Sequence, residues 1–595
     1  MNTGKIIDKI LNFFFDKKNL CIIGILLLAL ILRVIVASNV GPLADEMNVA
    51  VRSIDVHKSG TMNSVDECHS FYYLNEIVYK LTGNINLLTA RFTSILFGLL
   101  SILMIYLIVM KLYKNEKIAL TACFLAAISG FQIRFSLAEM DITMAFFVLL
   151  STYAFLTALY DRKDKWYYLS AIFLGLAVAI KTFAGIWVLS YFAFAIYYSF
   201  KNKEYRQRYL GRRGIKVVLI CAIIIFIFII PTIIANYLLY KDKGIVDFQV
   251  ARFFGINKEY WQKTGLGGID NPFMISQLKT GIVDASFTAF KRYDWALSLL
   301  GVIGFLVMFI KYKEQSIFLF LWFIFDYLFI AGTAWLDTHF VFNTLIFAIF
   351  AAVFLVEIDN RLKNKFRYFL AIILITVLVI NLFILAPFMT SQTAMAKMIA
   401  YKNKNIGDND LVIVDQRIFR GRTALMFYDK AYVESETLGQ LMNAVKDSKE
   451  QAVPIKTFFI EAAEDDYGWG TIGSQPELNA SVENQIKLIE SLTSMPGKII
   501  YGGGGYGEDT GPWLKVHELT LNLKPSVLKL TKQTHYHFLY PVGWEGEIFD
   551  KYQIYSDFDN LMNKFGFLIF YLTIGLEVLS PFIIIWFFIK SRNKD

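Results

Sequence analysis

Long apolar stretches alternate with short polar connections along most of the chain. A helix needs about 20 apolar residues to cross the hydrocarbon core of a bilayer, and about twelve stretches approach that length. They lie at residues 19–38, 89–111, 117–132, 142–160, 166–181, 183–200, 216–239, 294–310, 315–332, 338–356, 367–388 and 564–590. The pattern therefore predicts a polytopic α-helical membrane protein with about twelve transmembrane helices.

Basic residues gather in every second connection between these stretches. The basic connections lie at residues 5–18, 111–117, 162–165, 201–216, 311–313, 361–367 and 590–594. Because Lys and Arg accumulate on the cytoplasmic side of membrane proteins, an even number of crossings with both termini cytoplasmic places all of them on one side. A signal peptide is the alternative for residues 5–38, but no small-residue cleavage site follows, which favours an uncleaved first helix.

Three long segments are then expected outside the cytoplasm. They are residues 39–88, 240–293 and 389–563. The third has the size of a small domain. Apolar runs at 411–414 and 458–460 predict buried strands in it, and 436–447 predicts a helix, so we expect a mixed α/β domain. The predicted organisation is a transmembrane part at 1–388, this extracytoplasmic domain at 389–563, and a last helix with a basic tail at 564–595.

Composition agrees with a membrane protein and excludes two other classes. Of 595 residues, 56% are hydrophobic and 18% are charged, whereas soluble chains are about a quarter charged. Disorder and a single soluble domain are excluded. The net charge of +9 follows the basic connections, so topology explains it and nucleic acid is not an expected partner. Three of the four cysteines lie in apolar stretches, which leaves Cys68 alone and argues against a disulfide framework or a Cys-based zinc site.

Two adjacent carboxylates, Asp45 and Glu46, follow the first predicted helix. An amphipathic stretch at residues 47–56 comes next, and its spacing suits a helix on the membrane surface. Asp45 would lie near the start of that helix, where the helix dipole stabilises negative charge. A helix cap is the simpler interpretation of Asp45 taken alone. The surrounding sequence must therefore distinguish a cap from a functional carboxylate.

That context is an ordered series of motifs. After Asp45-Glu46 the chain has Asp66-Glu67-Cys68-His69, Ala90-Arg91-Phe92, Ala138-Glu139-Met140-Asp141 and the stretch from Gly175 to Lys181. The series resembles the lipid-phosphosugar-dependent glycosyltransferases of the GT-C fold, and among them the protein O-mannosyltransferases and the lipid A aminoarabinose transferases. The resemblance is good over roughly residues 20–200 and weaker over 200–390. The stretch at 411–428 also looks similar to the outer domain of the aminoarabinose branch.

The resemblance implies a catalytic acid in the first outer segment, which falls on Asp45. A sugar on a polyprenyl phosphate already has a good leaving group, so the reaction needs a base for the acceptor hydroxyl, worth about 10²–10⁴-fold. Attack opposite the departing phosphate inverts the anomeric centre. Glu46 would orient the acceptor or Asp45. Asp141 would bind the acceptor or a metal, or pair with Arg134; a solvated Asp at a helix start is an equal alternative.

The departing phosphate needs cations that face the outer leaflet. The candidates are Arg52, Lys58, His69, Arg91, Arg134 and Lys181. Lys181 lies between two apolar stretches, where a bare charge is costly, although a lysine can also extend to the interface. Arg33 is expected to pair with an acid of the first outer segment. His339 is a further candidate for the active site or for a metal.

The sequence departs from the aminoarabinose branch in two places. That branch has a Lys-Pro-Pro element after a Glu, whereas Cys68-His69-Ser70 follows Glu67 here. The basic residue that the branch places three after the acid is Asn48 here. Both differences remove basic residues of that branch, so its phosphate contacts and its aminoarabinose substrate do not carry over to this chain. No cofactor is predicted with certainty, and a divalent metal ion is left open. The acids of the second outer segment, Asp242, Asp247, Asp270, Asp284 and Asp294, are expected to be mostly solvated.

The leading hypothesis is an integral membrane glycosyltransferase. It would transfer mannose or a similar hexose from dolichyl or undecaprenyl phosphate to an extracytoplasmic glycan, protein or lipid. An oligosaccharyltransferase is one alternative, but of its Trp-Trp-Asp-Tyr-Gly signature only residues 466–470 come near. A transporter or lipid flippase is the other, and such proteins carry charges at the bilayer midplane. Here most ionisable residues lie at helix ends. The Lys-, Ile-, Asn- and Phe-rich composition suggests the cell membrane of a bacterium or archaeon.

Overall fold

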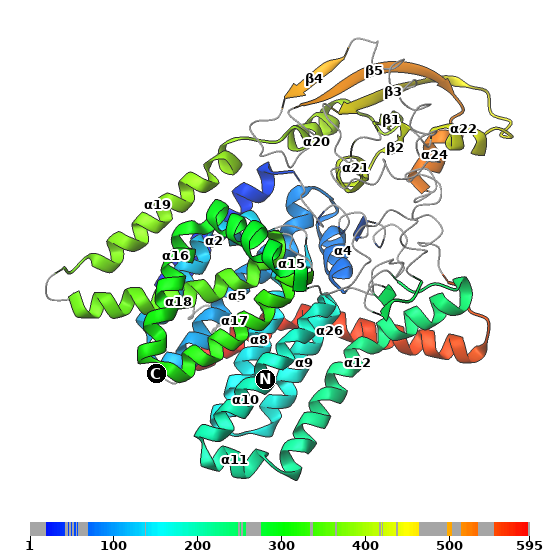
Figure 1. Ribbon diagram of the computed structural model, residues 1–595. Coiled ribbons are helices and arrows are strands. Elements are labelled where there is room, and N and C mark those ends of the chain that lie inside the picture. Colours follow the sequence, from blue (N-terminus) through cyan, green and yellow to red (C-terminus); the bar gives the residue numbers. More distant parts are fainter. Residues whose placement is uncertain are drawn as a thin grey trace, which may run out of the picture.

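A computed structural model describes most of the chain. The described residues are 19–41, 46, 49, 53, 54, 56, 70–136, 139–247, 250, 251, 254–257, 275–333, 337–362, 366–415, 418, 420–435, 438–462, 497–501, 513–533 and 552–592. Figure 1 shows a bundle of long helices with a small β-sheet at one end. We call that end of the bundle the sheet side, and residues 389–563 the sheet domain.

Helices occupy every predicted apolar stretch. They are α2 (Leu20–Asn39), α5 (Leu87–Tyr113), α6 (Glu116–Ile128), α8 (Met140–Asp161), α9 (Asp164–Ile180), α10 (Trp187–Lys201), α12 (Arg212–Lys243), α16 (Phe287–Lys311), α17 (Lys313–Thr333), α18 (Val341–Leu362), α19 (Phe369–Thr390) and α26 (Asp557–Arg592). Among the described residues, ten helices are long and apolar enough to cross a membrane. The predicted stretches that fall short are α6, with 13 residues, and α9, with 17.

Shorter helices connect or flank the long ones. They are α4 (Phe71–Thr82), α7 (Gly130–Arg134), η2 (Thr182–Ile186), α11 (Lys203–Tyr209), α15 (Ile275–Thr280), η3 (Gly281–Ser286), η4 (Asp337–Phe340), α20 (Ala394–Asn405), α21 (Arg420–Phe427), α22 (Leu438–Ala444) and α24 (Ser526–Gln533). Most of them lie at the ends of the bundle or in the sheet domain (Figure 1).

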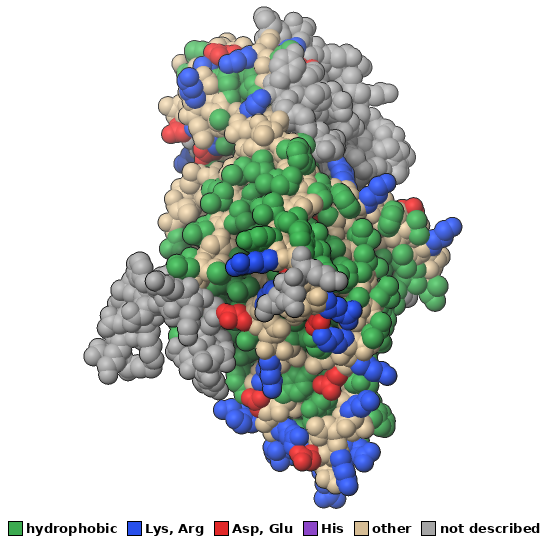
Figure 2. All heavy atoms as spheres, turned by 90° about the vertical axis from the view of Figure 1, so that its left-hand side faces the viewer, with side chains coloured by type: hydrophobic (Ala, Val, Ile, Leu, Met, Phe, Trp, Pro, Cys, Tyr) green, Lys and Arg blue, Asp and Glu red, His purple; other side chains and the backbone are tan. Residues whose placement is uncertain are grey.

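The long helices differ in how much protein surrounds them. In the most apolar part of each helix, 94% of the residues are buried in α8 and 89% in α18, but only 22% in α12 and 17% in α19. Figure 2 accordingly shows a broad band of hydrophobic side chains across the middle of the molecule, with Lys and Arg gathered at the lower end. Because α12 and α19 are apolar yet exposed, lipid is the environment that suits their outer faces.

A buried polar cluster explains why the helix is interrupted at Ser129, between α6 and α7. Helix α6 ends at Ser129, whose hydroxyl donates to the carboxylate of Asp294. Asn381 of α19 donates to the same carboxylate at 3.1 Å and to the carbonyl oxygen of Ile128 at 2.8 Å. Asp294 itself has a non-helical backbone inside α16, with φ −157° and ψ 38°. The cluster therefore joins three helices, and the expectation that Asp294 is solvated is wrong because the side chain is fully buried.

Two further expectations about charged residues are corrected. Asp247 is buried and accepts hydrogen bonds from the side chain of Asn236 and the backbone N–H of Val250. Arg33 does not pair with an acid among the described residues. Its guanidinium donates instead to the carbonyl oxygens of Ala29 and Ala127, each at 3.2 Å.

The sheet domain contains a five-stranded mixed sheet in the order β2-β1-β3-β5-β4. Its strands are β1 (Leu411–Val414), β2 (Ala431–Glu434), β3 (Val453–Ala462), β4 (Lys498–Tyr501) and β5 (Trp513–Leu523). Strand β1 is parallel to β2 and β3, while β5 is antiparallel to β3 and β4. The mixed α/β prediction is confirmed, including strands at 411–414 and 458–460. The helix expected at 436–447 is α22, which is shorter.

The two faces of the sheet have separate cores. Val412 and Val414 of β1 pack with α20, with α21 and with the sheet-side end of the bundle, whereas Leu411 and Ile413 pack with α22 and α24. This division follows from the alternation of side chains along a strand. The Tyr428 hydroxyl accepts a hydrogen bond from the backbone N–H of Ile85 at 2.7 Å and donates to Asn84 at 3.0 Å. The sheet domain therefore lies directly on the α4–α5 turn.

Candidate functional site at the sheet-side end of the bundle

Arg91 holds the chain that carries Glu46. It lies near the start of α5, where Asn86 caps the helix through the N–H groups of Leu88 and Thr89. The guanidinium binds the Glu46 carboxylate with both arms, at 2.7 Å from Nε and 2.8 Å from Nη2. Both side chains are fully buried. A planar fork of this kind matches a carboxylate in distance and direction, so it fixes the position of Glu46 strongly.

The remaining N–H groups of Arg91 bind the end of α2. Nη1 donates to the carbonyl oxygens of Ala37 and Val40, each at 2.7 Å, and Nη2 donates to that of Gly41 at 2.9 Å. A guanidinium has five N–H donors, and all five are used here. The prediction that Arg91 binds the donor phosphate is therefore corrected, because it has no N–H left for a phosphate. Its contacts instead hold Gly41 and Glu46, which flank Asp45 in the sequence; Asp45 itself lies outside the described residues.

Asp141 and Lys181 form a second ion pair at the same end. Asp141 is in the first turn of α8, and Lys181 lies at the break between α9 and η2. The Lys181 ammonium donates to both oxygens of Asp141, at 3.0 and 2.9 Å, and lies 4.9 Å from the ring centre of Phe183. The Asp141 side chain is 4% exposed and that of Lys181 15%. The expectation that Asp141 pairs with Arg134 or is solvated is thus corrected.

Hydrogen bonds join the elements that carry the two ion pairs. Ser94, about one turn after Arg91 in α5, donates to the carbonyl oxygen of Glu139, two residues before Asp141, at 3.0 Å. The backbone N–H of Ser70 donates to the carbonyl oxygen of Ala179, two residues before Lys181, at 3.2 Å. The helices that hold Arg91, Asp141 and Lys181 are therefore linked to one another and to the end of the first outer segment.

Arg134 and His339 are buried against aromatic rings. The Arg134 guanidinium lies 4.6 Å from the ring centre of Phe388 in α19. The His339 ring makes an edge contact with Phe183, with the ring centres 6.1 Å apart. The Phe183 ring therefore contacts both His339 and the Lys181 ammonium, which brings two of the predicted side chains to one place. The other predicted residues, Arg52, Lys58 and His69, lie outside the described residues, like Asp45.

Two buried carboxylates near these pairs were not predicted. Asp326 in α17 is fully buried, and Asn343 and Asp141 lie near it. Glu577 in α26 is also fully buried and accepts a hydrogen bond from the Ser70 hydroxyl at 2.6 Å. A single carboxylate inside an apolar stretch was the available signal, because such residues are rare in membrane helices and usually functional.

The site offers carboxylates, the amine of Lys181, the guanidiniums of Arg91 and Arg134, and the imidazole of His339. A deprotonated carboxylate can accept a proton from a hydroxyl, and the cations can stabilise a phosphate. Within the part of the chain that the structure describes, no group of three or more His, Cys, Asp or Glu side chains could hold a metal ion. The described side chains can therefore accept a proton and stabilise an anion.

Known proteins share parts of this sequence and this fold. Residues 66–234 match the family described as dolichyl-phosphate-mannose-protein mannosyltransferase. No curated protein sequence matches the chain. The structure is similar to that of ArnT from Cupriavidus metallidurans bound to undecaprenyl phosphate, with a TM-score of 0.50 and 11% identity, over 83% of this chain and 97% of that chain.

A further similarity is to the archaeal oligosaccharyltransferase AglB from Archaeoglobus fulgidus in complex with an inhibitory peptide and a dolichol-phosphate. Its TM-score is 0.46 and its identity 13%, over 85% of this chain and 74% of that chain. Together with the family match, the similarity to ArnT shows that the chain has the GT-C fold of the lipid-phosphosugar-dependent glycosyltransferases.

Proposed function

We propose that the chain is a membrane glycosyltransferase that moves one sugar from a polyprenyl phosphate to an acceptor hydroxyl outside the cytoplasm. The observation that carries the proposal is the pair of buried ion pairs at the sheet-side end, Glu46–Arg91 and Asp141–Lys181. Charges are costly inside a membrane protein, so the few that occur there are paired and usually mark a functional site. The sheet side is then the extracytoplasmic side, and both termini are cytoplasmic, in accordance with the basic connections.

Asp45 is the proposed general base. It takes the proton from the acceptor hydroxyl while the acceptor oxygen attacks the anomeric carbon and the bond from that carbon to the phosphate oxygen breaks. The attack comes from the face opposite the phosphate, so the anomeric configuration is inverted. Arg91 binds the carboxylate of Glu46 and the carbonyl oxygen of Gly41, so the two described residues that flank Asp45 are held in place. Such positioning matters, since a misplacement of 1 Å can cost about 100-fold in rate.

Lys181 is the proposed contact of the departing phosphate. The phosphate gains a negative charge when the sugar leaves, and a cation nearby stabilises that charge. An ammonium has three N–H donors, and Asp141 accepts two of them. The third can donate to a phosphate oxygen. Arg134, which lies against Phe388, is the second proposed cation, and Asp141 holds the Lys181 ammonium in the required position.

The donor class rests on the family match and on the fold. The matched family is named for dolichyl-phosphate-mannose, and the ArnT structure contains undecaprenyl phosphate. Both point to a sugar carried by a polyprenyl phosphate, and the family name favours mannose. The acceptor class is a hydroxyl of a glycan, protein or lipid. The sheet domain contacts the α4–α5 turn, next to Arg91, so we propose that it takes part in acceptor recognition.

Membranes that contain the chain provide a test of the donor class. They are incubated with radiolabelled polyprenyl phosphate mannose or with the corresponding nucleotide sugar, after the endogenous polyprenyl phosphate mannose synthases, which convert one into the other, have been removed genetically. We expect transfer of label from the lipid-linked donor and none from the nucleotide sugar. Asp284 is an exposed residue of η3, the short helix that precedes α16. The control variant Asp284→Asn should therefore transfer the label like the wild type. Transfer from the nucleotide sugar alone would contradict the proposal.

A further inference from the structure

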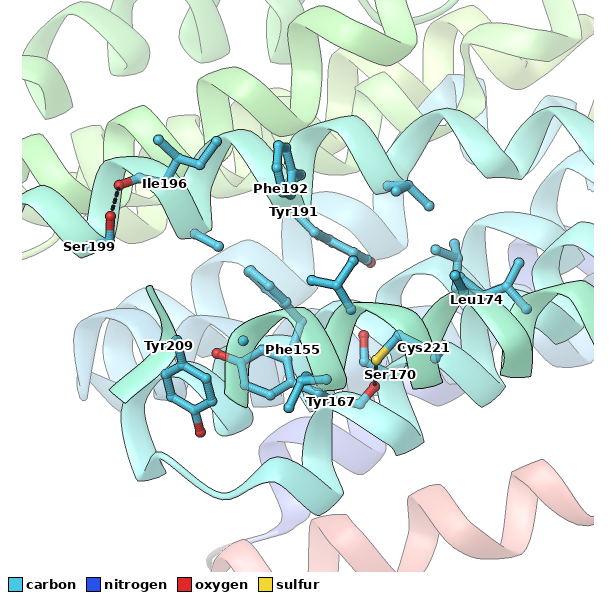
Figure 3. Close-up of a pocket in the computed structure, with 18 of the residues that line it drawn as sticks. Phe155, Tyr167, Ser170, Leu174, Tyr191, Phe192, Ile196, Ser199, Tyr209 and Cys221 are labelled. Carbon is cyan, nitrogen blue, oxygen red and sulfur yellow. Dashed lines mark hydrogen bonds between the residues drawn. The ribbon is translucent and has the colours of Figure 1, made fainter. Parts of the chain in front are cut away.

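An apolar groove lies at the end of the bundle away from the sheet domain. Helices α10 and α12 leave the two ends of α11 and form its sides, and α8 and α9 form its floor (Figure 3). Its volume is about 260 Å³. Typical lining residues are Phe155, Leu174, Phe192, Ile196 and Ile225. Phe192 is 55% exposed, so the groove opens toward the side of the bundle that faces lipid.

The few polar groups in the groove already have partners. The hydroxyls of Tyr167 and Tyr205 bind each other at 2.9 Å. The Ser199 hydroxyl donates to the carbonyl oxygen of Ile196 at 2.7 Å (Figure 3), and the Tyr191 hydroxyl binds that of Thr152 at 2.8 Å. The walls therefore offer hydrocarbon contacts and little else, and the ligand that suits them is an apolar chain rather than a sugar or a nucleotide.

The length of the groove matches one leaflet of a bilayer. One end is closed at α11, where Gly214 packs so tightly that a Cβ atom would lie 1.7 Å from the carbonyl oxygen of Tyr209. Toward the other end, α9 and α12 touch, and a Cβ atom at Gly175 would lie 2.2 Å from the ring of Phe228. From Gly214 to Ile225, α12 rises about 16 Å. Half of the hydrocarbon core of a bilayer is about 15 Å.

Positive charge surrounds the closed end. The segment at 201–216 holds seven Lys or Arg residues and one acid, Glu204. Glu204 pairs with Arg162, and Asp164 binds Arg213 at 2.8 Å. The other exposed cations of the segment have no ion pair with any described residue; they are Lys201, Lys203, Arg206, Arg212 and Lys216. The enrichment of Lys and Arg in cytoplasmic connections explains the positive charge of this segment. It does not explain why an apolar groove ends beside the segment.

We infer that this groove binds one hydrocarbon chain of an anionic phospholipid of the inner leaflet, and that the lipid phosphate lies against the basic segment at 201–216. The apolar walls take the chain, the length fits one leaflet, and the unpaired charges of the segment complement the phosphate. Basic segments beside a membrane helix attract anionic lipids with a strength that each Lys or Arg increases. The inference is independent of the proposed transfer reaction, which uses the opposite end of the bundle.

Native mass spectrometry of the purified full-length protein tests the inference. The probes are phosphatidylglycerol and phosphatidylcholine with identical chains. Ala195→Phe fills the groove, because Ala195 lines it, and Ala193→Phe on the same helix is the matched control. The double variant Arg206→Gln/Arg212→Gln removes two of the unpaired charges, and Arg361→Gln/Arg367→Gln removes two exposed charges from another basic connection.

We expect phosphatidylglycerol to bind the wild type and both control variants in preference to phosphatidylcholine. Ala195→Phe should lose this binding. The Arg206/Arg212 variant should bind about 30-fold more weakly, at about fivefold for each charge. Equal binding of both lipids, or equal binding by Ala195→Phe and Ala193→Phe, would overturn the inference. So would displacement of phosphatidylglycerol by an equimolar polyprenyl phosphate, because the groove would then hold the tail of the donor.

Discussion

The substitution Arg91→Lys tests whether the Glu46–Arg91 pair positions the proposed base, Asp45. The Arg91 guanidinium donates five hydrogen bonds, two to the Glu46 carboxylate and three to carbonyl oxygens at the end of α2. An ammonium has three donors and no planar fork, so at least two acceptors lose their partner. Each buried acceptor left without a partner costs about 1–3 kcal/mol. The total is about 2–6 kcal/mol, against a usual folding free energy of about 5–15 kcal/mol.

We therefore expect Arg91→Lys to remain inserted but to melt at a lower temperature. Its rate of sugar transfer should fall by about 100-fold or more, because the backbone beside Asp45 is no longer held. Thermal unfolding followed by intrinsic fluorescence and the transfer rate in the same preparation measure both effects. Arg361→Lys, an exposed arginine at the end of α18, is the control and should change neither.

A double-mutant cycle separates positioning from general damage. Glu46→Gln on its own should also reduce transfer, because it leaves the charge of Arg91 buried without a carboxylate. If the two residues act as one unit, the double variant should be little worse than the more damaged single variant. Transfer by Arg91→Lys within about twofold of the wild type, or fully additive effects in the cycle, would refute the reasoning.

Three other predictions concern separate parts of the molecule. Lys181→Met should lower the free energy of unfolding by about 3–5 kcal/mol because Asp141 is left as an unpaired buried charge. Adding Asp141→Asn should restore stability but not sugar transfer. A double variant that stays unstable would contradict the pairing. Asp294→Ala should lower the melting temperature, since two buried donors lose their acceptor, whereas the exposed Asp284→Ala should not; equal melting of the two would exclude the cluster as a support. Tyr428→Phe should speed hydrogen exchange at the α4–α5 turn. Burial raises the pKa of Tyr428, so its contact should hold below about pH 10, the usual tyrosine value, and weaken only as the pH rises through the raised pKa; loosening near neutral pH would argue against this contact.

The positions of the helices could be predicted because they follow from hydrophobicity and length alone. All the apolar stretches are helical. The alternation of basic connections predicted on which side of the membrane each connection lies. The break at Ser129 could not be predicted in this way. It depends on Asp294 and Asn381, which are distant in sequence and meet Ser129 only after the helices have packed.

The candidate site was predicted in its residue types but not in its pairings. The motif series predicted Glu46, Arg91, Asp141 and Lys181 as site residues. The sequence does not indicate which cation pairs with which carboxylate. Arg91 resembles a phosphate ligand in sequence, and only its contacts with α2 show that its donors are occupied. Asp326 escaped notice because one carboxylate hardly changes the hydropathy of an apolar stretch.

The most direct test of the central claim is the single-turnover rate of sugar transfer from polyprenyl phosphate mannose by purified wild type and Asp45→Asn. Donor binding is measured in the same samples. The substitution removes the base but keeps the size of the side chain. We predict unchanged donor affinity and a rate about 10²–10⁴-fold lower, which is the usual contribution of a general base. Equal rates in both proteins would contradict the role of Asp45 and with it the proposed mechanism.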